Sequence, residues 1–183
     1  MIQHQLLAGK RGVIFGALDE SSIAWHVATQ CVAEGAKITL TNAPVAMRFG
    51  TIQQLGEKLN AEVISADATS TEELTALFQK SVEILGGPLD FVLHSIGMSL
   101  NVRKGKTYTD INHEWMHKTL DISAMSFHRM MQVRYQTDSM ADGGSILALT
   151  YIAAQRVFPD YSEMADAKAV SYTHLRAHET DSY

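Results

Sequence analysis

Residues 12–40 read GVIFGALDESSIAWHVATQCVAEGAKITL and hold a β-rich run, a helical pattern and a second β-rich run. The sequence predicts strands over 12–15 and 37–41, with a helix over 22–34 between them. We expect Ser22 to cap the start of this helix and Gly35 to end it in a left-handed conformation. This order of elements is typical of a β-α-β unit with parallel strands.

The same alternation continues along the chain and decides the fold class. Further strands are predicted over 62–66, 90–94 and 145–149. A helix is expected to begin near Ser70, with Glu73 completing a capping box, and to end at residues 86–88. A longer helix is expected over 112–140, ended by residues 142–144. The prediction is a doubly wound, Rossmann-type α/β fold whose parallel sheet, with five strand candidates, is incomplete at its C-terminal end.

Length and composition limit the classes of function. The 183 residues are 46% hydrophobic and 19% charged, which suits one globular domain. A net charge of -5 gives no basic footprint for nucleic-acid binding. A single cysteine, Cys31, excludes an intrachain disulfide framework and is expected to be a buried thiol in a reducing compartment, which favours the cytoplasm. No run approaches membrane-spanning length, so we expect a soluble protein without a membrane partner.

The turn over residues 15–24 is a candidate nucleotide site. Backbone amides and the dipole at the start of a helix can bind a pyrophosphate, Gly16 would permit close backbone approach, and Ser22 could donate its hydroxyl. The full G-x-G-x-x-G pattern is absent, and a plain strand-to-helix connection fits the local sequence equally well. Asp67 could accept a hydrogen bond from adenine or could cap a turn.

Cofactor choice stays open after the second strand. No acidic residue follows it to mark the ribose of NAD, and Arg48 could either meet a 2′-phosphate or remain solvated.

Tyr161, Met164 and Lys168 stand at i, i+3 and i+7, so on a helix they share one face. One bound ligand could therefore contact all three side chains. The alternative is a purely structural role, in which the tyrosine and the lysine pack their apolar stems against the core.

This Tyr-x-x-Met-x-x-x-Lys motif, with Tyr151 ten residues before Tyr161, resembles the signature of FabI-type enoyl-acyl-carrier-protein reductases, a divergent group of short-chain dehydrogenases/reductases. The likeness covers residues 6–169 and includes the segments 16–24, 66–68 and 94–97. The resemblance implies a catalytic set and a dinucleotide-binding set. The catalytic residues are Tyr151, Tyr161 and Lys168, and the cofactor-binding residues are Gly16, Ser22, Asp67, Ser95, Ile96, Gly97 and Lys168.

The resemblance also implies a reaction. NADH or NADPH, with NADH preferred, would reduce the trans-2 double bond of an enoyl chain carried by acyl carrier protein, in a homotetramer. Tyr161 would hydrogen-bond the developing oxyanion, and Lys168 would hold the nicotinamide ribose and make the tyrosine more acidic. Tyr151 would position the substrate, and Met164 would shape the wall near the acyl chain. Two alternatives stay open: another short-chain oxidoreductase acting on a carbonyl, and an inactive nucleotide-binding fragment.

Residues 113–117 read HEWMH and match the zinc-binding H-E-x-x-H pattern. A third ligand would be needed, and His128 downstream has no ligand motif around it, so no metal is predicted.

The end of the chain is expected to be foreign to the fold. Residues 170–180, VSYTHLRAHET, resemble one translated frame of a transposase adapter used for DNA sequencing libraries. We therefore expect a truncated reductase domain over 1–169 and a non-native tail over 170–183.

Overall fold

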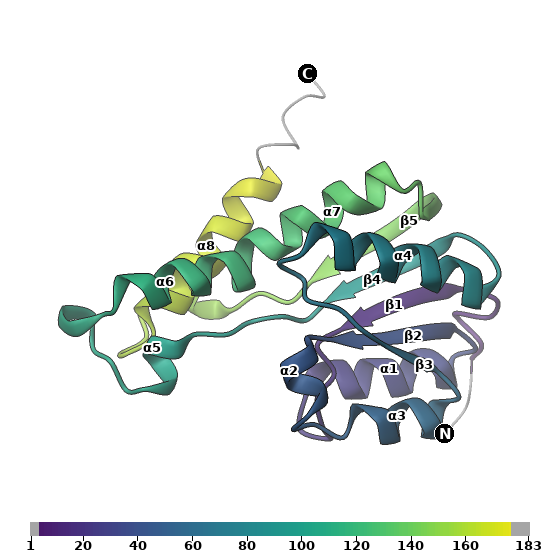
Figure 1. The fold of residues 1–183 in the computed structure, drawn as a ribbon, viewed down its shortest axis with the longest axis horizontal. Coiled ribbons are helices and arrows are strands. Elements are labelled where there is room, and N and C mark those ends of the chain that lie inside the picture. Colours follow the sequence, from purple (N-terminus) through teal and green to yellow (C-terminus); the bar gives the residue numbers. More distant parts are fainter. Residues whose placement is uncertain (1–3, 177–183) are drawn as a thin grey trace. The chain divides into compact units, whose positions relative to one another are not determined.

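A computed structural model describes residues 4–176 and contains a five-stranded, fully parallel sheet (Figure 1). The strand order is β3-β2-β1-β4-β5, which confirms the Rossmann-type prediction. The direction of winding reverses at β1, where the chain crosses to β4. The strands are β1 (Arg11–Phe15), β2 (Lys37–Asn42), β3 (Glu62–Ser65), β4 (Leu89–His94) and β5 (Met140–Ala148).

Helices connect these strands and make up most of the remaining regular structure. The helices are α1 (Ile23–Ala33), α2 (Pro44–Met47), α3 (Ile52–Leu59), α4 (Thr71–Leu85), α5 (Leu100–Arg103), η1 (Tyr108–Asp110), α6 (His113–Leu120), the π-helical turn η2 (Asp121–Met125), α7 (Ser126–Gln136), η3 (Ile152–Ala154) and α8 (Ser162–Arg176). Within the described residues, no helix is both long and apolar enough to cross a membrane.

The chain divides into two compact units. The sheet unit comprises Met1–Ser95 and Met130–Ala148, and the helical unit comprises Ile96–Arg129 and Leu149–Tyr183.

The sheet unit buries an apolar core on both faces of its parallel sheet. Figure 1 shows α1 and α3 on one face and α4 on the other. Phe15 on β1 and Phe78 on α4 are almost fully buried, with ring centroids 6.4 Å apart. Near-continuous apolar strands such as β1 are expected where both faces of a sheet are covered.

Helix ends in the sheet unit follow the sequence in part. Gly35 adopts φ +91° after α1, as predicted. The Ser70 hydroxyl accepts the amide of Glu73 at 3.2 Å, which confirms the start of α4. The capping box is wrong, because the Glu73 carboxylate instead accepts the amide of Asp67 at 2.7 Å.

Two predictions around the long helix are wrong. The helix begins after Asn112 as expected, but it contains the π-helical turn η2 and ends at Gln136. Strand β5 starts at Met140, and residues 141–144 shift its register against β4 instead of preceding the strand. The Asp-Gly-Gly sequence therefore interrupts a strand pairing, a position that glycine also favours.

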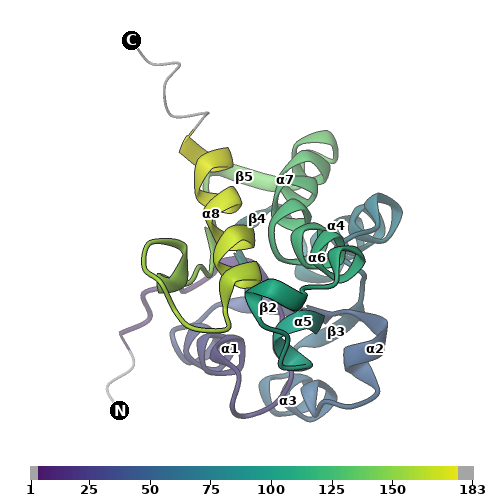
Figure 2. The same cartoon turned by 90° about the vertical axis from the view of Figure 1, so that its left-hand side faces the viewer.

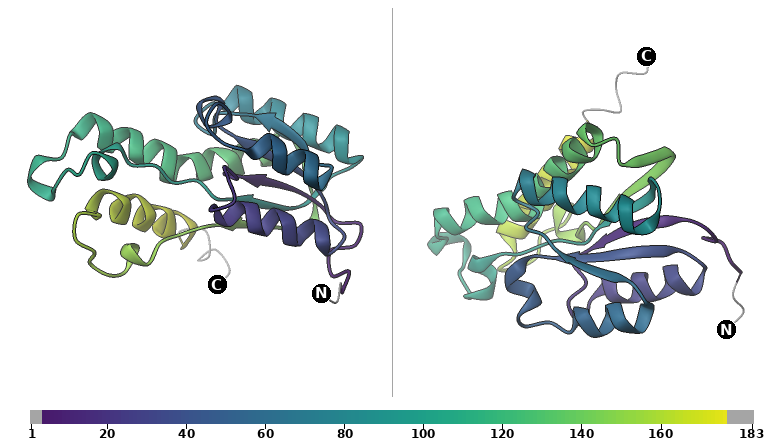
Figure 3. Two further views of the ribbon diagram at one scale, coloured as in Figure 1. Left: turned by 90° about the horizontal axis from the view of Figure 1, so that it is seen from below. Right: turned by 45° about the vertical axis from the view of Figure 1, so that its right-hand side comes forward.

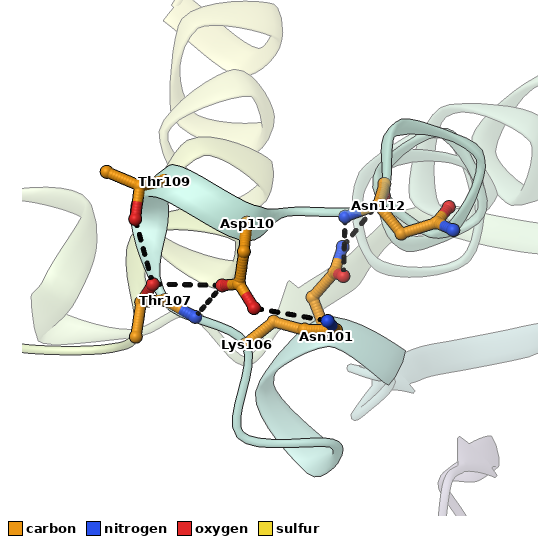
Figure 4. Close-up of polar contacts among 6 residues, drawn as sticks. All are labelled: Asn101, Lys106, Thr107, Thr109, Asp110 and Asn112. Carbon is orange, nitrogen blue, oxygen red and sulfur yellow. Dashed lines mark hydrogen bonds and ion pairs between the residues drawn. The ribbon is translucent and has the colours of Figure 1, made fainter.

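The helical unit packs short helices beside α8. Figures 2 and 3 show α5 and α6 near α8, and both contact it. Figure 4 shows how the loop between α5 and α6 is fixed: the Asn101 amide donates to the Asn112 carbonyl at 2.9 Å, and the Asn112 amide donates back to Asn101 Oδ1 at 3.0 Å. In the same loop, Thr107 and Asp110 form a reciprocal capping box. The start of α6 is thereby tied to α5.

Candidate active site

The candidate residues fall into two sets, one in each unit. Gly16, Ser22, Asp67 and Ser95 belong to the sheet unit, and Ile96, Gly97, Tyr151, Tyr161, Met164 and Lys168 belong to the helical unit.

Gly16 and Ser95 meet at the carboxyl ends of β1 and β4. Phe15 pairs with His94 across the two strands, so the next residues of each strand lie side by side. A Cβ on Gly16 would overlap the backbone carbonyl oxygen of Ser95, and Gly16 also has φ +87°. Only glycine fits this point, which is where doubly wound sheets bind ligands, outside the strand ends at the reversal of winding.

Ser22 stabilises the turn before α1. It occupies the N-cap position, but its side chain makes no cap hydrogen bond, so the predicted cap is wrong. Its hydroxyl instead donates to the carbonyl of Asp19 at 2.7 Å and accepts the amide of Leu18 at 3.2 Å. The first turn of α1 therefore has no side-chain cap and no acidic residue, which suits an anion.

Asp67 has a turn-capping role in this structure. Its Oδ1 accepts the Thr69 amide and the Thr69 hydroxyl, both at 2.8 Å. Contact with adenine stays a prediction. At the last residue of β2, the Asn42 side-chain amide donates to the Ala17 carbonyl at 2.9 Å, and Arg48 lies exposed beyond α2.

Lys168 on α8 is buried at 5% exposure and bonds to two backbone carbonyls. Its Nζ donates to Ile96 O at 2.8 Å and to Ser123 O at 3.1 Å. Burial lowers the pKa of Lys168 from 10.5 to about 8. A Cβ on Gly97 would lie 3.3 Å from Met164 Cε and 3.8 Å from Lys168 Cε. Four predicted site residues, Ile96, Gly97, Met164 and Lys168, are thus brought together.

Tyr151 and Tyr161 form a stacked pair. Their ring centroids are 5.2 Å apart and their planes differ by 21°. Partial burial, followed by the proximity of Tyr151, raises the pKa of Tyr161 above its usual 10.0. The expected lowering of the Tyr161 pKa by Lys168 is therefore wrong here, since that ammonium is directed at the carbonyls of Ile96 and Ser123.

Ser123 was not predicted as a site residue. Its hydroxyl accepts the Met98 amide at 2.9 Å and donates to the Met98 carbonyl at 3.0 Å, while its own carbonyl accepts Lys168. It lies in the π-helical turn, a feature often found at functional sites. The sequence feature that could have pointed to Ser123 is the presence of two serines, Ser123 and Ser126, within a predicted helix. The Ser126 hydroxyl donates a hydrogen bond to the Ile122 carbonyl at 2.6 Å.

The metal-like motif lies on the surface of α6. His113, Glu114 and His117 are all exposed. In residues 4–176, no group of three histidine, cysteine or acidic side chains is arranged to hold a metal ion. Cys31 is half-buried rather than fully buried, and burial raises the pKa of its thiol.

Comparison with known proteins decides the family. The sequence model described as Enoyl-(Acyl carrier protein) reductase matches residues 16–180, most of the chain. The chain belongs to the enoyl-(acyl carrier protein) reductase family. This match includes both tyrosines, Met164 and Lys168.

Curated proteins with similar sequences carry names of the same enoyl-(acyl carrier protein) reductase family. Enoyl-[acyl-carrier-protein] reductase [NADH] 1 of Rhizobium meliloti is 36% identical over 93% of this chain and 62% of its own length. FabI of Rickettsia bellii is 34% identical over 93% of this chain and 64% of its own length. The chain thus spans less than two thirds of the curated relatives' length.

Solved structures of the family match the fold. The FabI–NADH complex of Alistipes finegoldii has a TM-score of 0.92 and 55% identity, covering 96% of this chain and 62% of that one. The Bacillus cereus enoyl-acyl carrier protein reductase, solved with NADP+ and indole naphthyridinone, has a TM-score of 0.85 and 30% identity, covering 96% of this chain and 68% of that one.

Proposed function

We propose that this chain carries the cofactor-binding and catalytic residues of an enoyl-acyl-carrier-protein reductase in fatty-acid synthesis. The observation that carries the proposal is the grouping in the helical unit: a buried Lys168 bonded to Ile96, with Met164 beside Gly97, and a stacked Tyr151–Tyr161 pair. Membership of the reductase family gives this grouping its chemical meaning.

The residues present fit a nicotinamide dinucleotide. The close approach of the Gly16 and Ser95 backbones brings the ends of β1 and β4 together where the winding reverses, and the first turn of α1 offers uncapped amides. We assign Gly16, Ser22, Asp67 and Ser95 to the dinucleotide in the sheet unit, and Ile96, Gly97 and Lys168 in the helical unit. When bound, the cofactor supplies a hydride.

Tyr161 is proposed to stabilise charge on the substrate. Reduction of an enoyl thioester at its β-carbon places negative charge on the thioester oxygen, and a phenol can donate a hydrogen bond to that oxygen. A phenol is protonated at neutral pH, as this donation requires, and partial burial raises the pKa of Tyr161 further above neutrality. The stacked Tyr151 ring restricts the Tyr161 ring and is proposed to position the substrate.

Lys168 is proposed to hold the hydroxyls of the nicotinamide ribose. Its ammonium has three protons, and two hydrogen bonds to carbonyls leave one for a ligand. Met164, in contact range of the Gly97 backbone, is proposed to form an apolar wall beside the acyl chain.

The names of the relatives support the choice of cofactor and partner. Several are named as NADH enzymes, and one solved relative holds NADH while another holds NADP+. We propose NADH as cofactor and an enoyl chain on acyl carrier protein as substrate. A homotetramer in the cytoplasm completes the proposal.

The chain is proposed to consist of a reductase part, residues 1–169, and a non-native tail, residues 170–183. The adapter-like sequence of the tail and the share of the relatives' length that is matched support this division. The family match itself extends to residue 180 and marks no boundary at 169. Of the tail, residues 177–183 lie outside the described structure. Sequencing the parent gene past residue 169 tests the division: a family-like continuation supports it, and an unchanged tail contradicts it.

Enzyme assays test the proposed activity. The full-length product of the parent gene is expected to consume NADH only when a trans-2-enoyl thioester is added. Folded protein that oxidises alcohols or reduces ketones but leaves the enoyl thioester unchanged would overturn the proposal.

A further inference from the structure

Glu163 is a buried acidic side chain with one hydrogen-bond partner in the part of the chain that the structure describes. It lies on α8 between Tyr161 and Met164 and is 1% exposed. The Ser99 hydroxyl, 4% exposed, donates to Glu163 Oε2 at 2.6 Å. Among the described residues, Glu163 Oε1 has no hydrogen-bond partner. Burying a carboxyl group with so few partners costs stability, so an apolar residue would be the better choice if packing alone mattered.

Ser99 connects Glu163 to the segment that follows β4. Its hydroxyl also accepts the amide of Val102 at 3.1 Å, which caps α5. Ser99 lies two residues beyond Gly97, and its neighbour Met98 is held on both backbone groups by Ser123. The Glu163 contact therefore fixes the far end of residues 96–99.

Helix α8 holds both ends of this segment. The segment runs from Ile96, its near end, to Ser99, its far end. At the near end, Lys168 donates a hydrogen bond to the Ile96 carbonyl. At the far end, Glu163 accepts one from the Ser99 hydroxyl, and between the two ends Met164 lies beside Gly97. The same helix follows Tyr161 directly. The position of residues 97–99 relative to Tyr161 and Met164 is thus set by side chains of one helix.

We infer that Glu163 is a positioning residue, which acts through Ser99 to hold Met98 and Ser99 as the part of the active-site wall that receives the enoyl thioester. This inference rests on the proposed function. It assigns the near end, held by Lys168, to the cofactor, and the far end, held by Glu163, to the substrate.

The test is steady-state kinetics on the full-length product of the parent gene. Glu163→Leu and Ser99→Ala are each expected to raise KM for the enoyl thioester about tenfold, because small displacements of a binding wall weaken substrate binding. The dissociation constant for NADH is expected to stay within about twofold, since the Lys168–Ile96 contact is untouched. Glu163→Gln retains an oxygen acceptor for Ser99 and is expected to keep KM within about threefold of the unaltered protein.

A double variant and a matched control separate positioning from general destabilisation. Because the two residues act as a pair, Ser99→Ala/Glu163→Leu is expected to be no worse than the worse single variant. Asp166→Asn changes an exposed carboxylate on the same helix and is expected to change neither constant. Faster hydrogen exchange at the Val102 amide should accompany the KM increase in Glu163→Leu, with sheet amides unchanged.

The outcomes are distinct. Turnover by the unaltered protein, combined with an unchanged KM in Glu163→Leu, overturns the inference and leaves the proposed function standing. A loss of NADH affinity equal to the rise in KM also overturns it, because the role would then be structural. Folded, unaltered protein without enoyl turnover rejects the proposed function, and the positioning role with it, whatever the exchange data show.

Discussion

Both units of this chain bury some polar side chains, but among the described residues only the helical unit places a buried lysine and a buried glutamate on one helix. The sheet unit has an apolar core of strand and helix residues such as Ile14, Leu40 and Phe78. The helical unit buries two ionisable side chains on α8, those of Lys168 and Glu163. It also buries Ser123 and Ser99, the serines to which they are hydrogen-bonded. Regular packing suffices for a scaffold, whereas buried polar groups with few partners cost stability and point to function.

The largest expected effect is a loss of stability from a substitution in the core of the sheet unit, away from the candidate site residues. Phe78→Ala is expected to lower the free energy of unfolding by about 3–5 kcal/mol, because it leaves a cavity beside Phe15 in a fully buried core. Urea denaturation measures this. Ile84→Ala, on the exposed side of the same helix, is the control and should cost less than about 1 kcal/mol. Equal losses in both variants would contradict the packing described for α4.

The next effect concerns cofactor affinity in the helical unit and not the stability of the sheet unit. Lys168→Met removes the ammonium but keeps a side chain suited to a buried position, so we expect at least about a tenfold loss of NADH affinity, or about 1.4 kcal/mol. Fluorescence titration of NADH measures it. Lys118→Met, an exposed lysine on α6, should leave the affinity unchanged. Unchanged affinity in Lys168→Met would remove the ribose-binding role.

The pH dependence of cofactor binding sharpens the same contrast. The pKa of Lys168 is lowered to about 8 by burial, so the ammonium is lost as pH rises through that value. If the charged form holds the ribose, the dissociation constant for NADH should rise above pH of about 8, by up to about tenfold per pH unit. Tyr161→Phe should show the same profile, because the raised pKa of Tyr161 keeps the phenol protonated there. A flat profile up to pH of about 9.5 would contradict the assignment to Lys168.

The smallest effect concerns a polar pair inside the sheet unit. The hydroxyls of Thr39 and Ser81 are buried and 2.9 Å apart. Ser81→Ala leaves the Thr39 hydroxyl without this partner and should cost about 1 kcal/mol in urea denaturation. Thr39→Val/Ser81→Ala removes both hydroxyls and should recover part of that loss. A double variant with the sum of both single losses would contradict a pairwise contact.

How much the sequence predicted also differs between the units. Alternating apolar runs placed the first four strands and α1 and α4, because those elements follow local periodicity. The start of β5 was missed, since an Asp-Gly-Gly sequence fits a turn as well as a shifted strand register. In the helical unit, the family motif located Tyr161, Met164 and Lys168. The resemblance also put Ile96 in the same site as Lys168. The hydrogen bonds of Lys168 to backbone carbonyls 72 and 45 residues away were not predictable from local sequence, and Ser123 lies in a π-helical turn that no local pattern marks.

The most direct test of the central claim compares the full-length product of the parent gene with its Tyr161→Phe variant. NADH consumption on a trans-2-enoyl thioester is expected in the first protein, and the variant should lose about 100-fold or more in kcat/KM, with NADH affinity retained. Equal kcat/KM in the two proteins would contradict the role of Tyr161, and absence of enoyl turnover in both, despite folded protein, would contradict the reductase proposal itself.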